Sequence, residues 1–110
     1  GGEDAGTRPM EMVLMGLAGC ASFDVVTILE KKKAQLVGLD VSVSATRKDQ
    51  IPAVFEKIIL EFTVSAKNVS EISVEKAVNL SLDKYCSVAA MLRAGGTIIE
   101  AVVNLNAVEG

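Results

Sequence analysis

A long apolar helical segment, from Met10 to Leu29, constrains the fold more than any other feature of this sequence. Pro9 stands where the first turn of a helix tolerates proline, and apolar residues then recur at helical spacing. A helix that is apolar nearly all round is a buried one, so we expect a long central helix inside the fold. The small residues Gly16, Ala18 and Gly19 predict that another backbone packs closely at mid-helix.

Two other interpretations of this segment are disfavoured by the residues around it. The uncharged stretch from Met12 to Phe23 is too short for a membrane span of about 20 residues. The string Leu17-Ala18-Gly19-Cys20 resembles the lipobox of bacterial lipoprotein signal peptides, but acidic residues outnumber the single Arg8 before it, where a positive region is expected. We therefore expect a cytoplasmic protein with no membrane contact.

Alternating apolar and polar residues predict three strands. The first covers Leu39 to Thr46 and the second Phe55 to Ser65, and their short connection through Pro52 favours an antiparallel hairpin. The third strand is expected from Thr97 to Ala107. Each strand has one apolar face, which is typical of a sheet covered on one side only.

Helical patterns fill the interval between the second and third strands. One begins at Ser73 and buries a side that ends with Tyr85, and a shorter one runs from Cys86 or Ser87 to Arg93. The 110 residues are enough for one domain, and half of them are apolar. We predict a single α+β domain over residues 1–110, with a long central helix, an antiparallel sheet and a second helix.

The chain contains no histidine, which excludes several kinds of site. Ser-His-Asp triads, Cys-His dyads and His-ligated metals all need an imidazole. Two cysteines alone cannot complete the four ligands of a structural zinc site, so we expect neither a metal nor a cofactor. A net charge of −3, with three Phe, one Tyr and no Trp, argues against nucleic-acid binding.

The two cysteines, Cys20 and Cys86, are the strongest candidates for chemistry. Unpaired cysteine is among the most buried residue types, so a pair of inert thiols is one interpretation. A structural disulfide is disfavoured because nothing signals export to an oxidising compartment. Cys86 stands at an expected helix N-terminus, where the helix dipole stabilises a thiolate. Cys20 needs a nearby cation for the same effect, and the candidates are Arg8, Lys84 or an arginine of a partner chain.

The residues around both cysteines also carry a family resemblance. The segment from Arg8 to Cys20, RPMEMVLMGLAGC, has a proline and a carboxylate that lead to a helical cysteine, and the helix continues to Leu29. A second cysteine motif, KYCSV, surrounds Cys86, and a candidate middle strand runs from Phe55 to Val64. In this order and separation, these motifs resemble the OsmC/Ohr family (osmotically inducible protein C and organic hydroperoxide resistance proteins) over nearly the whole chain.

This resemblance implies a thiol peroxidase that acts in oxidative stress defence. Cys20 is then the peroxidatic nucleophile and Cys86 the resolving thiol. Glu11 is either a carboxylate that orients the activating cation or a first-turn carboxylate favoured by the helix dipole. The implied substrates are an organic hydroperoxide and a dithiol reductant. Apolar side chains expected to admit the hydroperoxide are Leu14, Leu17 and Phe23. The resemblance also implies an intertwined homodimer with active sites at the subunit interface, and a chain that lacks the family's N-terminal strands.

An alternative interpretation is a non-catalytic OsmC-like dimer that binds an apolar ligand or serves as a scaffold, with inert buried thiols. In the family pattern a glutamate directly follows the helix-start proline, whereas here Met10 does and Glu11 comes one residue later. Among the other polar residues, Asp24 is expected to need a structural partner if buried. We expect Tyr85 to pack in the core with its hydroxyl bonded, and Lys84 to be solvated.

Overall fold

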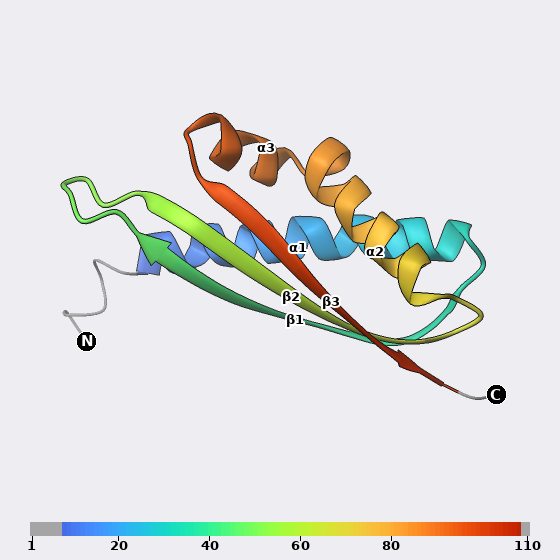
Figure 1. Ribbon diagram of the computed structural model, residues 1–110. Helices are drawn as coiled ribbons and strands as arrows, with labels where there is room; N and C mark the ends of the chain where they lie inside the picture. The colour runs from blue at the N-terminus through green and yellow to red at the C-terminus, as the bar shows by residue number, and fades with distance from the viewer. Residues whose placement is uncertain (1–7, 109–110) are drawn as a thin grey trace.

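In the computed structural model, which describes residues 8–108, one long helix lies along a twisted three-stranded sheet (Figure 1). The elements follow in the order α1 (Arg8–Lys31), β1 (Gln35–Arg47), β2 (Phe55–Lys67), α2 (Glu71–Leu80), the π-helical turn η2 (Ser81–Tyr85), α3 (Ser87–Ala94) and β3 (Ile98–Ala107). The body is long and thin, measuring 50 × 31 × 17 Å. The predicted α+β class is confirmed.

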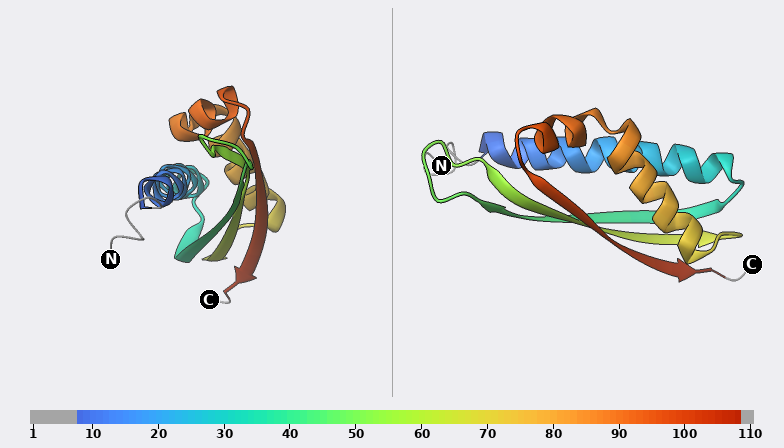
Figure 2. Two further views of the ribbon diagram at one scale, coloured as in Figure 1. Left: turned by 90° about the vertical axis from the view of Figure 1, so that its left-hand side faces the viewer. Right: turned by 45° about the horizontal axis from the view of Figure 1, so that its top comes forward.

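The core lies between the helices and one face of the sheet. Alternate residues of β2 are fully buried on that face: Ile58, Leu60, Phe62 and Val64. α1 contacts β1 and α2, and α2 contacts β3 (Figure 2). The other face is exposed. On it Asn104 donates to Glu61 at 2.9 Å and Lys57 pairs with Glu100 at 2.8 Å, beside the exposed Ile98 and Val102. A sheet covered on one side, as predicted from the alternation, is confirmed.

The sheet is mixed, with strand order β1-β2-β3. β1 and β2 form the predicted antiparallel hairpin, in which Val41 lies opposite Phe62. The prediction of an antiparallel sheet is wrong for the third strand, because β3 pairs with β2 in parallel, with Ile98 beside Lys57. The helical crossover through α2, η2 and α3 returns the chain to the beginning of β2, and parallel neighbours need such a crossover.

α1 is buried along one stripe rather than all round. Four side chains of this stripe have no exposed surface: Leu17, Ala21, Val25 and Leu29. On the opposite side, Met15 and Phe23 are 72% and 73% exposed. The prediction of a helix enclosed on every face is therefore wrong for the single chain, because the sheet covers one side of α1 only. By length and composition α1 is apolar enough to cross a membrane, a test that core helices of soluble proteins also pass.

Candidate functional site

Cys86 is the N-terminal cap of α3, as its sequence context predicts. The turn η2 ends at Tyr85, and the Cys86 backbone N–H donates to the Ser81 carbonyl oxygen, five residues earlier, at 2.7 Å. The Cys86 sulfur accepts a hydrogen bond from the Ala89 backbone N–H at 3.4 Å. Since the residue is only 2% exposed, its thiol is held in one place between η2 and α3.

Arg93 holds the chain just before Cys86. Its guanidinium donates to the Leu82 carbonyl oxygen at 2.9 Å and to the Ile99 carbonyl oxygen at 3.2 Å. It also pairs with the Asp83 carboxylate at 2.8 Å. Arg93 therefore links η2 to α3 and β3. The sequence marked Arg93 only as the end of a helix and did not indicate this positioning role.

Cys20 reaches the same place from the middle of α1, where it is half-buried. Its sulfur, the Cys86 sulfur and a carboxylate oxygen of Asp24 all lie within 4.8 Å of one another. Asp24 follows Cys20 by four residues, so the two side chains share a face of the helix. Both thiols are free. The structure thus brings together the two cysteines singled out from the sequence and adds a carboxylate to them.

The Asp24 carboxylate has the structural partner that its position predicts. The buried Ser81 hydroxyl donates to Asp24 Oδ2 at 3.0 Å and lies 3.3 Å from the Ala21 carbonyl oxygen. This contact joins the start of η2 to α1. Sequence reasoning missed Ser81, because a serine inside a helical segment gives no sign of its partner 57 residues earlier.

The environment of Cys86 favours its protonated form. Burial raises the pKa of the Cys86 thiol to about 11, and the adjacent Cys20 thiol contributes to the increase, whereas the Ala89 N–H acts in the opposite direction. The helix N-terminus was expected to favour a Cys86 thiolate, and this expectation is wrong because burial outweighs the N–H donors. At neutral pH Cys86 keeps its proton.

We expect Cys86 to make the protein less stable in alkali. The pKa of the thiol is about 11 in the folded chain against an ordinary value of 9.0. The raised pKa favours folding below pH 9, and this contribution is lost as the pH rises through 11. The loss is on the order of 2 kcal/mol. Denaturant unfolding from pH 8 to pH 11 measures it, and the Cys86→Ala variant should lack this part of the decline. Identical declines in both proteins would contradict the assignment.

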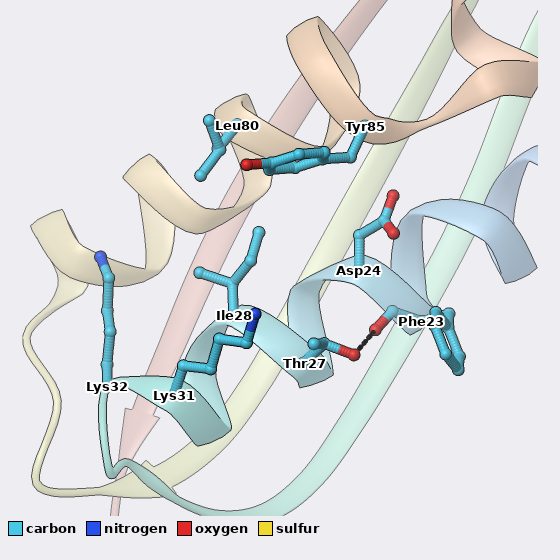
Figure 3. A pocket seen from close by; sticks show the side chains of 8 residues that line it. All are labelled: Phe23, Asp24, Thr27, Ile28, Lys31, Lys32, Leu80 and Tyr85. Atoms are coloured by element: carbon cyan, nitrogen blue, oxygen red, sulfur yellow. Dashed lines mark hydrogen bonds between the residues drawn. The ribbon is translucent and has the colours of Figure 1, made fainter.

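A groove of about 490 Å³ opens between α1 and the segment formed by α2 and η2 (Figure 3). Its lining is largely apolar with lysines at one end: Phe23, Asp24, Thr27, Ile28, Lys31, Lys32, Leu80 and Tyr85. Asp24 rises from α1 toward the Tyr85 ring (Figure 3). Asp24 therefore belongs both to the groove and to the cysteine cluster, whereas neither cysteine is among the residues that line the groove.

Several predicted side-chain positions differ in the structure. Tyr85 does not pack in the core, because it is half-exposed and its ring lies under the Lys84 ammonium, 5.4 Å from the ring centroid. Of the apolar side chains expected to admit a substrate, Phe23 lines the groove. Leu17 is instead buried in the core, and Leu14 lines a separate hollow near the start of α1.

Glu11 lies away from the thiols within the single chain. Nine positions separate it from Cys20 along α1, which corresponds to about 13 Å along the axis and roughly half a turn around it. Its side chain is exposed and lines a hollow together with Arg47 and Phe55. One chain therefore brings Cys20 and Cys86 together but leaves Glu11 apart from them.

The family model of OsmC-like proteins matches residues 1–101. This range includes the helix that carries Cys20, the hairpin beside it and the second cysteine. The chain belongs to the OsmC family. It is 43% identical over 89 residues to Protein YhfA of Escherichia coli, an alignment that covers 81% of this chain. The chain spans 66% of the length of that curated relative.

Solved structures share the fold of this OsmC-family chain. A hypothetical protein from Aquifex aeolicus is 31% identical, with a TM-score of 0.85 over 92% of this chain and 75% of its own. An organic hydroperoxide resistance protein OsmC from Legionella pneumophila has a TM-score of 0.71 and 14% identity, over 87% of this chain and 68% of its own. The second likeness shows the fold alone, and the predicted OsmC-like fold is confirmed.

Proposed function

We propose that this OsmC-family protein is a thiol peroxidase that reduces organic hydroperoxides. The observation that carries the proposal is the approach of the Cys20 and Cys86 sulfurs to within 4.8 Å of each other. A disulfide needs a sulfur–sulfur distance of about 2 Å, so a small movement of the two segments would join them. Membership of a family whose solved structures include a hydroperoxide resistance protein supports the same chemistry.

The proposed reaction proceeds in three balanced steps. The Cys20 thiolate attacks one peroxide oxygen, the O–O bond breaks, and the alkoxide takes up a proton and leaves as the alcohol. Cys20 is then a sulfenic acid, which the Cys86 sulfur attacks to form a disulfide and release water. A dithiol reductant restores both thiols by exchange and becomes a disulfide itself. We place this cycle in the cytoplasm, where thiols are kept reduced.

The difference between the two thiols supports this division of roles. Cys86 is buried, and its raised pKa keeps it protonated at neutral pH. Cys20 is the more exposed thiol and stands beside Asp24, which lines the groove. A thiol that meets a substrate has to be reachable, whereas a resolving thiol has to reach only its partner sulfur. Cys20 is therefore the nucleophile in the proposed cycle.

A Cys20 thiolate beside the Asp24 carboxylate would bring two negative charges together, so the proposed reaction needs a nearby cation. Of the cations predicted from the sequence, Lys84 lies over the Tyr85 ring. The side chain of Arg8 lies outside the described residues. We infer that a second copy of the chain supplies the cation and that Glu11 orients it across the interface. This role of Glu11 requires the dimer, since Glu11 does not meet Cys20 in the single chain.

An apolar stripe on α1 is the surface that we propose for the homodimer. It consists of Met12, Met15, Gly16, Gly19 and Phe23, which lie on the side opposite the buried stripe. A Cβ atom placed on either glycine would meet nothing within 4 Å from elsewhere in the described part of the chain. The close backbone approach predicted at Gly16 and Gly19 is therefore not made within the described part of the chain, and in the proposed dimer a second copy would make it.

We expect the Met15→Asp substitution to convert a dimer into monomers. The new carboxylate would lose its water in an apolar interface without gaining a partner, so the dissociation constant should rise at least about a hundredfold. Sedimentation of the wild type and the variant measures this change. Met91 on α3 is similarly exposed, at 69% against 72%, and Met91→Asp should remain dimeric. A monomeric wild type or a dimeric Met15→Asp protein would exclude this interface.

Hydroperoxide consumption tests the proposed activity. Reduced protein, supplied with tert-butyl hydroperoxide and excess dithiothreitol, should convert many equivalents of peroxide and oxidise one dithiothreitol for each. Alkylation of both thiols before the assay should stop the reaction. Peroxide loss no faster than in the alkylated control would refute the proposed activity.

The groove favours one alternative, a dimer that binds an apolar ligand without catalysis. Its walls include Phe23, Ile28 and Leu80, with Lys31 and Lys32 near one end. Such a protein would bind an apolar fluorescent anion in the groove, and the substitution Leu80→Asp would weaken that binding. Binding of this kind, together with no peroxide turnover, would replace the peroxidase proposal with this one.

A further inference from the structure

We propose that the reduced Cys20–Asp24–Cys86 cluster is a binding site for one Zn²⁺ ion per chain. The proposal does not depend on peroxidase activity, because it concerns only the donor atoms of the reduced protein. The sequence alone offered two thiols and predicted no metal. The structure changes that expectation by placing a third donor, the Asp24 carboxylate, beside both sulfurs.

The spacing of the donor atoms is close to what a zinc ion requires. Zn–S bonds are about 2.3 Å and Zn–O bonds about 2.0–2.2 Å, so tetrahedral ligands lie roughly 3.5–3.8 Å from one another. The three donors here are all within 4.8 Å of one another. A shift of about 1 Å would therefore bring them to bonding distance around one ion. Cys20 and Asp24 are four residues apart on α1, so their side chains lie on the same face of the helix and can bind one ion together.

The donor types select for a thiophilic divalent ion. Thiolate ligands favour Zn²⁺ over Mg²⁺ and Ca²⁺, which prefer oxygen ligands. When the metal binds, the two thiol protons pass to the solvent and both sulfurs bind as thiolates. The N–H of Ala89, which already points to the Cys86 sulfur, remains a donor to the coordinated thiolate.

A residue next to the cluster fixes the orientation of one of its three donors, as hydrogen-bond partners of metal ligands do. The buried Ser81 hydroxyl fixes Asp24 through the 3.0 Å hydrogen bond to Oδ2, which leaves the other carboxylate oxygen free to bind. Partners of this kind orient ligands and raise metal affinity. A water molecule would complete the four ligands of such an ion.

Metal binding and peroxide chemistry would compete for the same sulfurs at this site. A thiolate bound to zinc shares its charge with the metal and is therefore a weaker nucleophile. We expect Cys20 to react with peroxide faster in the metal-free form, and the disulfide form has no thiolate to bind zinc. The reduced protein is then the only state of the cluster that binds the ion.

Titration with Co²⁺ and Zn²⁺, without peroxide, tests the site. The reduced wild type should bind one Co²⁺ per chain with a sulfur-to-cobalt charge-transfer band, and one equivalent of Zn²⁺ should displace it. Cys20→Ser and Cys86→Ser should each lose most of that band. Asp24→Asn should bind at least about tenfold more weakly. Glu30→Gln, which removes an exposed carboxylate from the same helix, should bind as the wild type does.

Two further measurements keep the test independent of folding and of catalysis. Circular dichroism confirms that each variant is folded, and Zn²⁺ should raise the melting temperature of the wild type but not of Cys86→Ser. The absence of a charge-transfer band in the reduced wild type would overturn the site. An Asp24→Asn protein with unchanged affinity would overturn it as well. Neither result bears on peroxide turnover, which is measured without metal.

Discussion

The Cys20→Ser variant is expected to lose hydroperoxide reduction by at least about 10³-fold. The attacking group in the proposed cycle is a thiolate, and a serine hydroxyl neither ionises near neutral pH nor forms a stable oxidised intermediate. The side chain is half-buried in mid-helix, and serine is close to cysteine in size, so the variant should fold. Consumption of tert-butyl hydroperoxide in the presence of dithiothreitol measures the effect.

Ser22→Ala provides a matched control for this variant. Ser22 lies on α1 two residues from Cys20 and is similarly half-buried. We expect it to retain the turnover of the wild type, and both variants should show the same helical circular dichroism. Rapid turnover by Cys20→Ser would exclude Cys20 as the nucleophile, whatever its distance from Cys86.

The Cys86→Ser variant should still react once with peroxide but should then become inactivated. Without the resolving sulfur within 4.8 Å, the Cys20 sulfenic acid persists and a second peroxide oxidises it to sulfinic and then sulfonic acid. We expect the first-turnover rate to stay within about threefold of the wild type while activity decays during repeated turnover. Mass spectrometry of Cys20 peptides after graded peroxide exposure follows the modification.

Ser87→Ala is the control for that experiment, because Ser87 is the exposed neighbour of Cys86 at the start of α3. It should turn over without accumulating sulfinic acid. Sustained turnover by Cys86→Ser, with Cys20 remaining reduced, would show that Cys86 has no resolving role. The short distance between the sulfurs would then have to serve another purpose, such as metal binding.

Local patterns in the sequence predicted most of the fold because each pattern has a direct physical cause. The alternation from Ile58 to Val64 reflects a strand with one buried face, and all four apolar residues of that alternation are fully buried. Gly95 and Gly96 mark the end of α3, and Gly96 adopts a positive φ of 98°. The direction of β3 was not predictable in this way, because it depends on where the crossover returns the chain.

The candidate site was predictable only in part. The cysteine motifs identified Cys20 and Cys86, and the fold places them together. The bond between Ser81 and Asp24 depends on how α2 packs against α1, and no local pattern reports it. Tyr85 was wrongly predicted to lie on the buried side of its helix. The π-helical turn η2 changes the direction in which side chains point just before Cys86, so the helical spacing does not hold there. Long-range packing, rather than propensity, determines these details.

Disulfide mapping after addition of one equivalent of hydroperoxide to the reduced protein decides whether Cys20 and Cys86 form a redox pair. Non-reducing peptide mapping identifies the linked residues, and alkylation counts the remaining thiols. We expect an intrachain Cys20–Cys86 disulfide in nearly every chain and no free thiol. Two thiols that both remain free and alkylatable after peroxide treatment would contradict it.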